Sequence, residues 1–140
     1  MARIRTIKPE AFASETLSQL SVDAERSFFG LLTQVDDEGR EKDRPAVLNG
    51  ALWPLRPNHR PEDMVKDMDA MAAADGLLCR YNVAGRDYFH LTTFLDHQRI
   101  NRPSVSKIPP CPKCDGLALA GQPNKSNVRE LPGFSDSAAS

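Results

Sequence analysis

The hydrophobic period of this chain changes from helical to strand-like at Gly76, and this change most constrains the fold. Two short runs follow, LLCRYNV and RDYFHLTTF, in which apolar and aromatic side chains alternate with polar ones; only Ala84 and Gly85 separate them. Such alternation around a tight turn predicts a β-hairpin. The segments before Gly76 have a different period, so the hairpin is expected to follow a set of helices.

Helices are predicted wherever apolar residues recur at helical spacing between capping signals. After Ser21, a suitable N-cap, one helical face carries Ala24, Phe28, Leu31, Leu32 and Val35. Two further helices are predicted over residues 45–53 and 61–75, because Pro opens each of them and Pro54 or Gly76 stops it. A short helix over residues 14–20 and an edge strand over residues 40–42 complete the pattern.

The core is expected to form mainly from the third of the longer helices. Met64, Met68 and Met71 share one face of it, and Met often fills irregular gaps in cores. Trp53 and Phe12 are expected to close the ends of the same core.

The order helix, short strand, helix, helix, hairpin is that of a winged helix, so we predict an α+β fold with a winged helix-turn-helix domain. Its three-helix core and β-hairpin wing would occupy residues 14–98. A flexible basic N-terminal arm is predicted over residues 1–13, and a basic, Pro-rich arm with a CxxC pair over residues 99–116. Residues 117–140 are rich in Gly, Pro, Ser, Asn and Ala, and we expect a disordered tail there.

Charge is segregated along the chain although its formal total is only -1. Residues 1–8 carry +3, residues 9–75 carry -7, and residues 76–113 carry +4. No acidic residue lies between Asp96 and Asp115. A polyanion would therefore meet the two basic flanks more readily than the acidic middle.

Residues 1–110 contain five sequence pieces in order: MARIRTIKPEAF, FFGLLTQVDDEGR, DRP, ADGLLCRY and FLDHQRINRPSVSKIP. Together they resemble the N-terminal winged-helix module of phage and prophage replication initiators, or replisome organisers, and related phage helix-turn-helix DNA-binding proteins. The resemblance implies binding of double-stranded DNA, sequence-specific or structure-directed, in phage or prophage replication initiation. Initiators usually continue into a large C-terminal part thought to engage a helicase or its loader, whereas this sequence ends soon after the Pro-rich segment. The alternative is therefore a phage or prophage transcription regulator.

The candidate DNA contacts are basic residues of the two arms and the hairpin. Exposed Lys and Arg neutralise phosphates, and Pro-restrained arms can follow a backbone or enter a minor groove. The candidates are Arg3, Arg5, Lys8, Arg80, Arg86, Arg99, Asn101, Arg102 and Lys107. Asn101 can also hydrogen-bond to a base edge, whereas the hairpin arginines would touch phosphate. The competing interpretation is that these basic runs are only solvated surface.

The helix predicted over residues 61–75 suggests a different function. The second helix of a helix-turn-helix normally enters the major groove, where phosphates would repel its acidic side chains. These are Glu62, Asp63, Asp67, Asp69 and Asp75, against the single base Lys66. The alternative is therefore an adaptor that does not bind DNA and contacts a basic host or phage protein through this helix.

CPKC at Cys111 and Cys114 has the spacing of a zinc knuckle, but zinc normally needs four ligands. The other candidates are Cys79, His59, His90 and His97, and no second CxxC or HxxxH is present. We therefore predict no metal and no cofactor within the chain, and leave open a site completed by a second chain of a homodimer. No nucleophile-base constellation is apparent, so the protein is not expected to be an enzyme.

The remaining sequence features suggest a cytoplasmic protein, and the resemblance to phage proteins implies a bacterial host cell. No apolar run approaches the roughly 20 residues that a membrane-spanning helix needs. MARIRTIKPE lacks the apolar region of a signal peptide, and an odd number of cysteines does not form a secreted disulfide framework.

Overall fold

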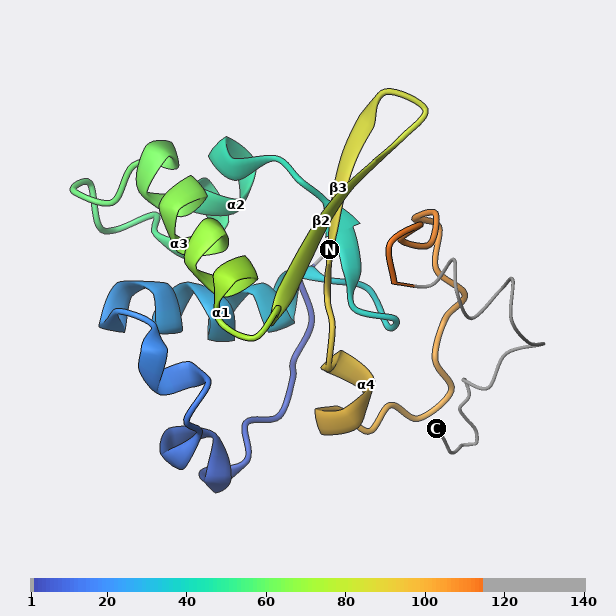
Figure 1. Ribbon diagram of the computed structural model, residues 1–140, viewed down its shortest axis with the longest axis horizontal. Coiled ribbons are helices and arrows are strands. Elements are labelled where there is room, and N and C mark those ends of the chain that lie inside the picture. Colours follow the sequence, from blue (N-terminus) through green and yellow to red (C-terminus); the bar gives the residue numbers. More distant parts are fainter. Residues whose placement is uncertain (1, 115–140) are drawn as a thin grey trace. The chain divides into compact units, whose positions relative to one another are not determined.

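The computed structural model describes residues 2–114, and the chain divides into two compact units, residues 1–109 and 110–140 (Figure 1). All helices and strands of the described residues belong to the first unit. The tail predicted over residues 117–140 lies outside the described residues. Within residues 2–114, no helix has the length and apolar character needed to cross a membrane.

The helix α1 (Val22–Gln34) begins where its capping signal predicts. Ser21 Oγ accepts a hydrogen bond from the backbone N–H of Ala24 (3.1 Å), one of the amides that the first turn leaves unpaired. Asp23 and Glu25 lie in that turn, where the helix dipole favours negative charge.

The helix predicted over residues 14–20 is shorter than expected. The structure has a 3₁₀ segment, η2 (Leu17–Gln19), within this range, and a further 3₁₀ segment, η1 (Pro9–Ala13), before it. Ser14 Oγ accepts the backbone N–H of Leu17 (3.2 Å), as an N-cap serine does at the start of a helical turn.

The helices α2 (Pro45–Leu52) and α3 (Pro61–Ala73) both begin at the predicted prolines. Asp63 Oδ2 accepts the backbone N–H of Arg60 (2.9 Å) and so completes the first turn of α3. After α3 the chain turns at Gly76, whose φ of +66° lies in the left-handed region that favours glycine.

The strands β1 (Arg40–Lys42), β2 (Leu78–Val83) and β3 (Arg86–Leu91) form an antiparallel sheet in the order β1-β3-β2. The hairpin turn is the predicted one, with positive φ at Ala84 and Gly85 (54° and 81°), as a type I′ turn requires. Figure 1 shows α1, α2 and α3 grouped to one side of the hairpin. The short helix α4 (Phe94–His97) follows β3.

The hydrophobic core lies between one face of the sheet and these helices. Phe89 of β3 and the three α3 methionines are fully buried, at 0% exposure, as predicted for the methionines. The core also contains Leu31, Leu32, Val35, Leu48, Trp53, Leu78, Leu91 and Phe94. The prediction that Phe12 closes the core is wrong, because its side chain is 72% exposed and rests on the ring of Phe29 at the rim. The α+β class is confirmed, and the element order is compatible with a winged helix.

A buried polar network connects α1, α2, α3 and the loop before α3. Asp67 Oδ2 accepts hydrogen bonds from Ser27 Oγ (2.7 Å) and His59 Nε2 (2.8 Å). Asn49 Oδ1 faces His59 Nδ1 (2.6 Å), and Trp53 Nε1 donates to Ser27 Oγ (3.0 Å). Trp53 also stacks on the His59 ring, with centroids 3.7 Å apart. All five side chains are buried, so the network fixes the angle between α2 and α3.

We expect Asp67→Ala to lower the free energy of unfolding by about 3 to 5 kcal/mol, because it leaves buried donors on Ser27 and His59 without an acceptor. Asp69→Ala is the matched control, since this carboxylate on the same helix is 65% exposed; its loss should cost under about 1 kcal/mol. Urea unfolding followed by the fluorescence of Trp53, the single tryptophan, measures both. Equal losses in the two variants would contradict a stabilising network.

Candidate nucleic-acid interface

The N-terminal segment, residues 2–8, lies against the C-terminal end of α1. The Arg5 guanidinium donates hydrogen bonds to the carbonyls of Leu32 (2.9 Å) and Val35 (2.8 Å) and lies 5.0 Å from the ring centroid of Phe94. Carbonyls at a helix C-terminus lack helical partners and attract a cation. The Arg5 side chain is only 7% exposed, so it stabilises α1 and is not presented to a ligand.

Asp37, in the loop between α1 and β1, joins three distant parts of the chain. Its Oδ1 pairs with Arg3 (2.7 Å) and Arg5 (3.4 Å), and its Oδ2 accepts the backbone N–H of Ser104 (2.8 Å). Burial alone would raise the pKa of Asp37. The Ser104 hydrogen bond and the charges of Arg3 and Arg5 outweigh burial, so the pKa lies below its ordinary value of 3.8.

Residues 99–109, which we call the strap, run along the first unit beside this loop. Ser106 Oγ donates to Asp36 Oδ2 (2.5 Å), and its backbone N–H donates to Glu38 Oε2 (3.2 Å). Further along, the Pro109 carbonyl accepts the hydroxyl hydrogen of Tyr81 (2.7 Å). The segment predicted as an extended, Pro-rich arm is therefore attached at several points along its length.

Gln98 links the start of the strap to the N-terminal segment. Its Oε1 accepts the backbone N–H (3.2 Å) and the hydroxyl hydrogen (3.1 Å) of Thr6, and its Nε2 donates to the Thr6 carbonyl (2.7 Å). Lys8 and Arg99 lie one or two residues from this contact along the chain. The two basic segments therefore meet at one part of the surface.

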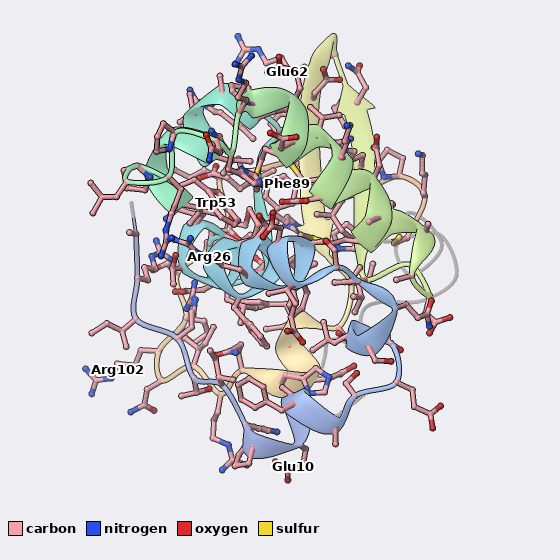
Figure 2. All side chains as sticks on the ribbon, turned by 90° about the vertical axis from the view of Figure 1, so that its left-hand side faces the viewer. Glu10, Arg26, Trp53, Glu62, Phe89 and Arg102 are labelled. Atoms are coloured by element: carbon pink, nitrogen blue, oxygen red, sulfur yellow. The ribbon has the colours of Figure 1, made fainter. Side chains whose placement is uncertain are left out.

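The charged side chains of the strap remain exposed because its anchors are uncharged. Backbone amides and serine hydroxyls bind the acidic loop, while Arg99, Arg102 and Lys107 are exposed and have no ion-pair partner within residues 2–114. Successive side chains of an extended chain point to opposite sides, so Ser106 can face the body while Lys107 faces solvent. Asn101 is exposed as well. Figure 2 shows Arg102 extending away from the body of the first unit.

The two hairpin arginines have different surroundings. Arg80 pairs with Asp43 (2.8 Å) and Asp69 (2.7 Å), which ties the sheet to α3. Burial raises the pKa of Asp43, and the charge of Arg80 offsets only part of that effect. Arg86, beside the hairpin turn, is exposed. Only Arg86 of this pair therefore faces solvent.

The carboxylates of α3, which suggested an adaptor, mostly serve contacts within the chain. Asp63 completes the first turn of its own helix, Asp67 lies in the buried network, Asp69 pairs with Arg80, and Asp75 accepts a hydrogen bond from Thr16 (2.8 Å). A protein partner would have to displace these contacts. The helix thus presents much less available negative charge than its sequence implies.

A possible pair of metal ligands lies on the face of the sheet opposite Phe89. Cys79 and His90 are direct partners in the register of β2 and β3. The ring of Tyr81 packs edge-on against His90, with centroids 6.0 Å apart. A thiolate and an imidazole are both zinc ligands. We did not predict this pair, although counting outward from the two-residue turn aligns residue 79 with residue 90.

The anchoring residues were also missed. Asp37, Gln98, Ser104 and Ser106 hold the basic segments, but no local pattern distinguishes them from ordinary loop and cap residues. Their partners are far away in sequence: 67 residues separate Asp37 from Ser104. Only the tertiary structure brings them together.

The structure thus gathers some of the candidate DNA contacts and uses others internally. Lys8, Arg99, Asn101, Arg102 and Lys107 belong to one region, Arg86 lies on the hairpin, and Arg3, Arg5 and Arg80 form internal ion pairs. The chain matches no protein-family model, no curated protein and no solved structure. Its function is therefore argued from this geometry and from the sequence resemblance.

Asp37→Asn should lower the free energy of unfolding at pH 7 by about 1.5 to 3 kcal/mol, because charge-assisted hydrogen bonds are lost. A carboxyl whose folded pKa is depressed stabilises the fold above its unfolded pKa and loses this contribution as pH falls through the folded pKa. The gap between wild type and Asp37→Asn should therefore close as pH falls below 3.8. Urea titrations at several pH values measure the gap, with the exposed Asp96→Asn as control; a gap independent of pH would contradict the assignment.

Proposed function

We propose that this protein binds double-stranded DNA through the strap and the adjoining N-terminal segment, in the initiation of phage or prophage replication. The observation that carries the proposal is the strap, in which Ser104 and Ser106 bind the acidic loop while Arg99, Arg102 and Lys107 remain exposed. Each cation that meets a phosphate releases condensed counterions, so this surface favours a nucleic-acid duplex.

A winged helix-turn-helix arrangement supports the same function. In this interpretation α2, the following loop and α3 are the helix-turn-helix, and the β2–β3 hairpin is the wing. The buried network around Asp67 holds the two helices at a fixed angle, as a helix that docks in a groove requires. Arg86 is the candidate phosphate contact of the wing.

The outward surface of α3 carries less unpaired negative charge, and so repels DNA less, than the composition of the helix implies. Asp67 is buried, and Asp69 is neutralised by Arg80. Arg60 and Lys66 are exposed on or beside this helix. Glu62 remains exposed on α3, so the helix itself adds no attraction for the major groove and the strap supplies most of it.

Transcriptional regulation remains the alternative, because a regulator would use the same DNA surface. The resemblance to replication initiators favours replication. The adaptor hypothesis has less support, since four of the five carboxylates on which it depended make contacts within the chain.

Replacing Arg99, Arg102 and Lys107 together by Ala should weaken binding to a mixed-sequence duplex and flatten its dependence on salt. The slope of log affinity against log salt should fall in magnitude by about 2 to 3, because each lost phosphate contact removes about 0.9 from it. Fluorescence anisotropy over a range of NaCl concentrations measures the slope.

A charge-matched comparison pairs the double variant Arg99→Ala and Lys107→Ala with a control that replaces Lys42 and Arg44, which are exposed on β1 and just before α2. The control changes the net charge equally but should change the slope by less than about 1. Equal slopes for the two double variants would show that the strap is not the binding surface. Absence of binding by the wild-type protein at low salt would contradict DNA binding itself.

A further inference from the structure

The strap ends beside the Cys79–His90 pair. Tyr81, two residues after Cys79 on β2, shares its face of the sheet. Its hydroxyl donates to the Pro109 carbonyl (2.7 Å), and its ring packs against that of His90. The last residues of the first unit are therefore held on the face of the sheet that carries these two metal-binding side chains.

The next few residues supply two more ligands. Cys111 follows Pro109 by two residues, a reach of at most about 7 Å. Cys111 and Cys114 enclose a turn, and thiolates separated by two residues can share one metal ion. The chain thus brings a thiolate pair within a short distance of a thiolate-imidazole pair.

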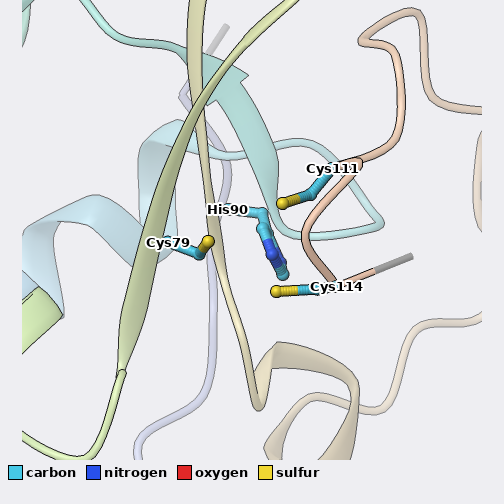
Figure 3. A group of neighbouring side chains, drawn as sticks. All are labelled: Cys79, His90, Cys111 and Cys114. Carbon is cyan, nitrogen blue, oxygen red and sulfur yellow. The ribbon is translucent and has the colours of Figure 1, made fainter. Parts of the chain in front are cut away.

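We propose that Cys79, His90, Cys111 and Cys114 bind one zinc ion. Figure 3 draws the four side chains as one group, and their ligand atoms all lie within 4.8 Å of one another. A tetrahedral site with Zn–S bonds of about 2.3 Å places its ligand atoms about 3.8 Å apart. Closing these side chains on an ion therefore needs movements of about 1 Å or less.

The chemistry of the donor set selects zinc and a structural role. Three thiolates and one imidazole are soft to borderline ligands, which exclude Mg²⁺ and Ca²⁺. Four protein ligands close the tetrahedron and leave no position for a substrate, as in structural zinc sites. Three thiolates and Zn²⁺ leave one negative charge, and Arg40, the register partner of His90 on β1, provides a cation nearby.

The zinc site goes beyond the proposed DNA binding and does not depend on it. Its role would be to hold Cys111 and Cys114 to Cys79 and His90 of the hairpin. Zinc binding would also raise the free energy of unfolding, because the four ligands are brought together only in the folded chain.

The test uses the full chain, purified from a zinc-supplemented culture without chelators or a polyhistidine tag. Elemental analysis should find about one zinc per chain, and Co²⁺ added to the apoprotein should give the visible bands of a tetrahedral thiolate site. Cys79→Ser, Cys111→Ser and His90→Ala should each lose most of the zinc. His97→Ala is the matched control, since His97 is exposed on α4 and should leave the zinc content unchanged.

A rescue variant separates ligation from folding. His90→Cys should keep zinc as a four-thiolate site, whereas His90→Ala should not. Chelation should lower the melting temperature of wild type and of His97→Ala but leave that of His90→Ala unchanged. The proposal is overturned if wild type binds neither Zn²⁺ nor Co²⁺, if it holds a Cys111–Cys114 disulfide or an iron–sulfur chromophore instead, or if His97→Ala loses as much zinc as His90→Ala.

Discussion

One carboxylate, Asp37, decides how the basic parts of this chain are arranged. Arg3, Arg5 and the backbone amide of Ser104 all converge on it, so the N-terminal segment and the strap share a single acceptor. Hydrogen bonds to a charged, mostly buried acceptor are worth about 1.5 to 3 kcal/mol each, well above an exposed ion pair. Without this negative charge, two guanidinium groups would crowd each other and the strap would lose its first anchor.

Whether a basic side chain forms an internal ion pair or stays exposed depends on whether the fold places a carboxylate beside it. Arg80 lies between Asp43 and Asp69 and becomes part of the scaffold, as Arg3 and Arg5 do at Asp37. The strap differs because serine hydroxyls and amides make its contacts to the same acidic loop. Its arginines and its lysine therefore remain in water, which is how a chain with little net charge presents a locally positive surface.

The local parts of this structure could be predicted from sequence, whereas the contacts between distant segments could not. The α1 cap at Ser21, the prolines that open α2 and α3, and the turn at Ala84 and Gly85 are short-range signals, and the structure confirms them. Of the helix predicted over residues 14–20, only the 3₁₀ segment η2 forms. The contacts of Asp37 could not be predicted from the local sequence, since its partners lie 32 to 67 residues away along the chain.

The strap shows why anchoring matters more than the number of positive charges. A free Pro-rich arm must lose backbone and side-chain freedom when it meets a duplex, at about 1 to 2 kcal/mol per ordered residue for the backbone alone. Contacts at Asp37, Ser106 and Tyr81 order the strap in the free protein. Binding would therefore cost less conformational entropy than it would for a free arm. The contacts to Asp37 are electrostatic and weaken in acid, whereas a metal held by thiolates and an imidazole would resist salt and yield to chelators. The two ends of the strap would therefore respond to different chemical conditions.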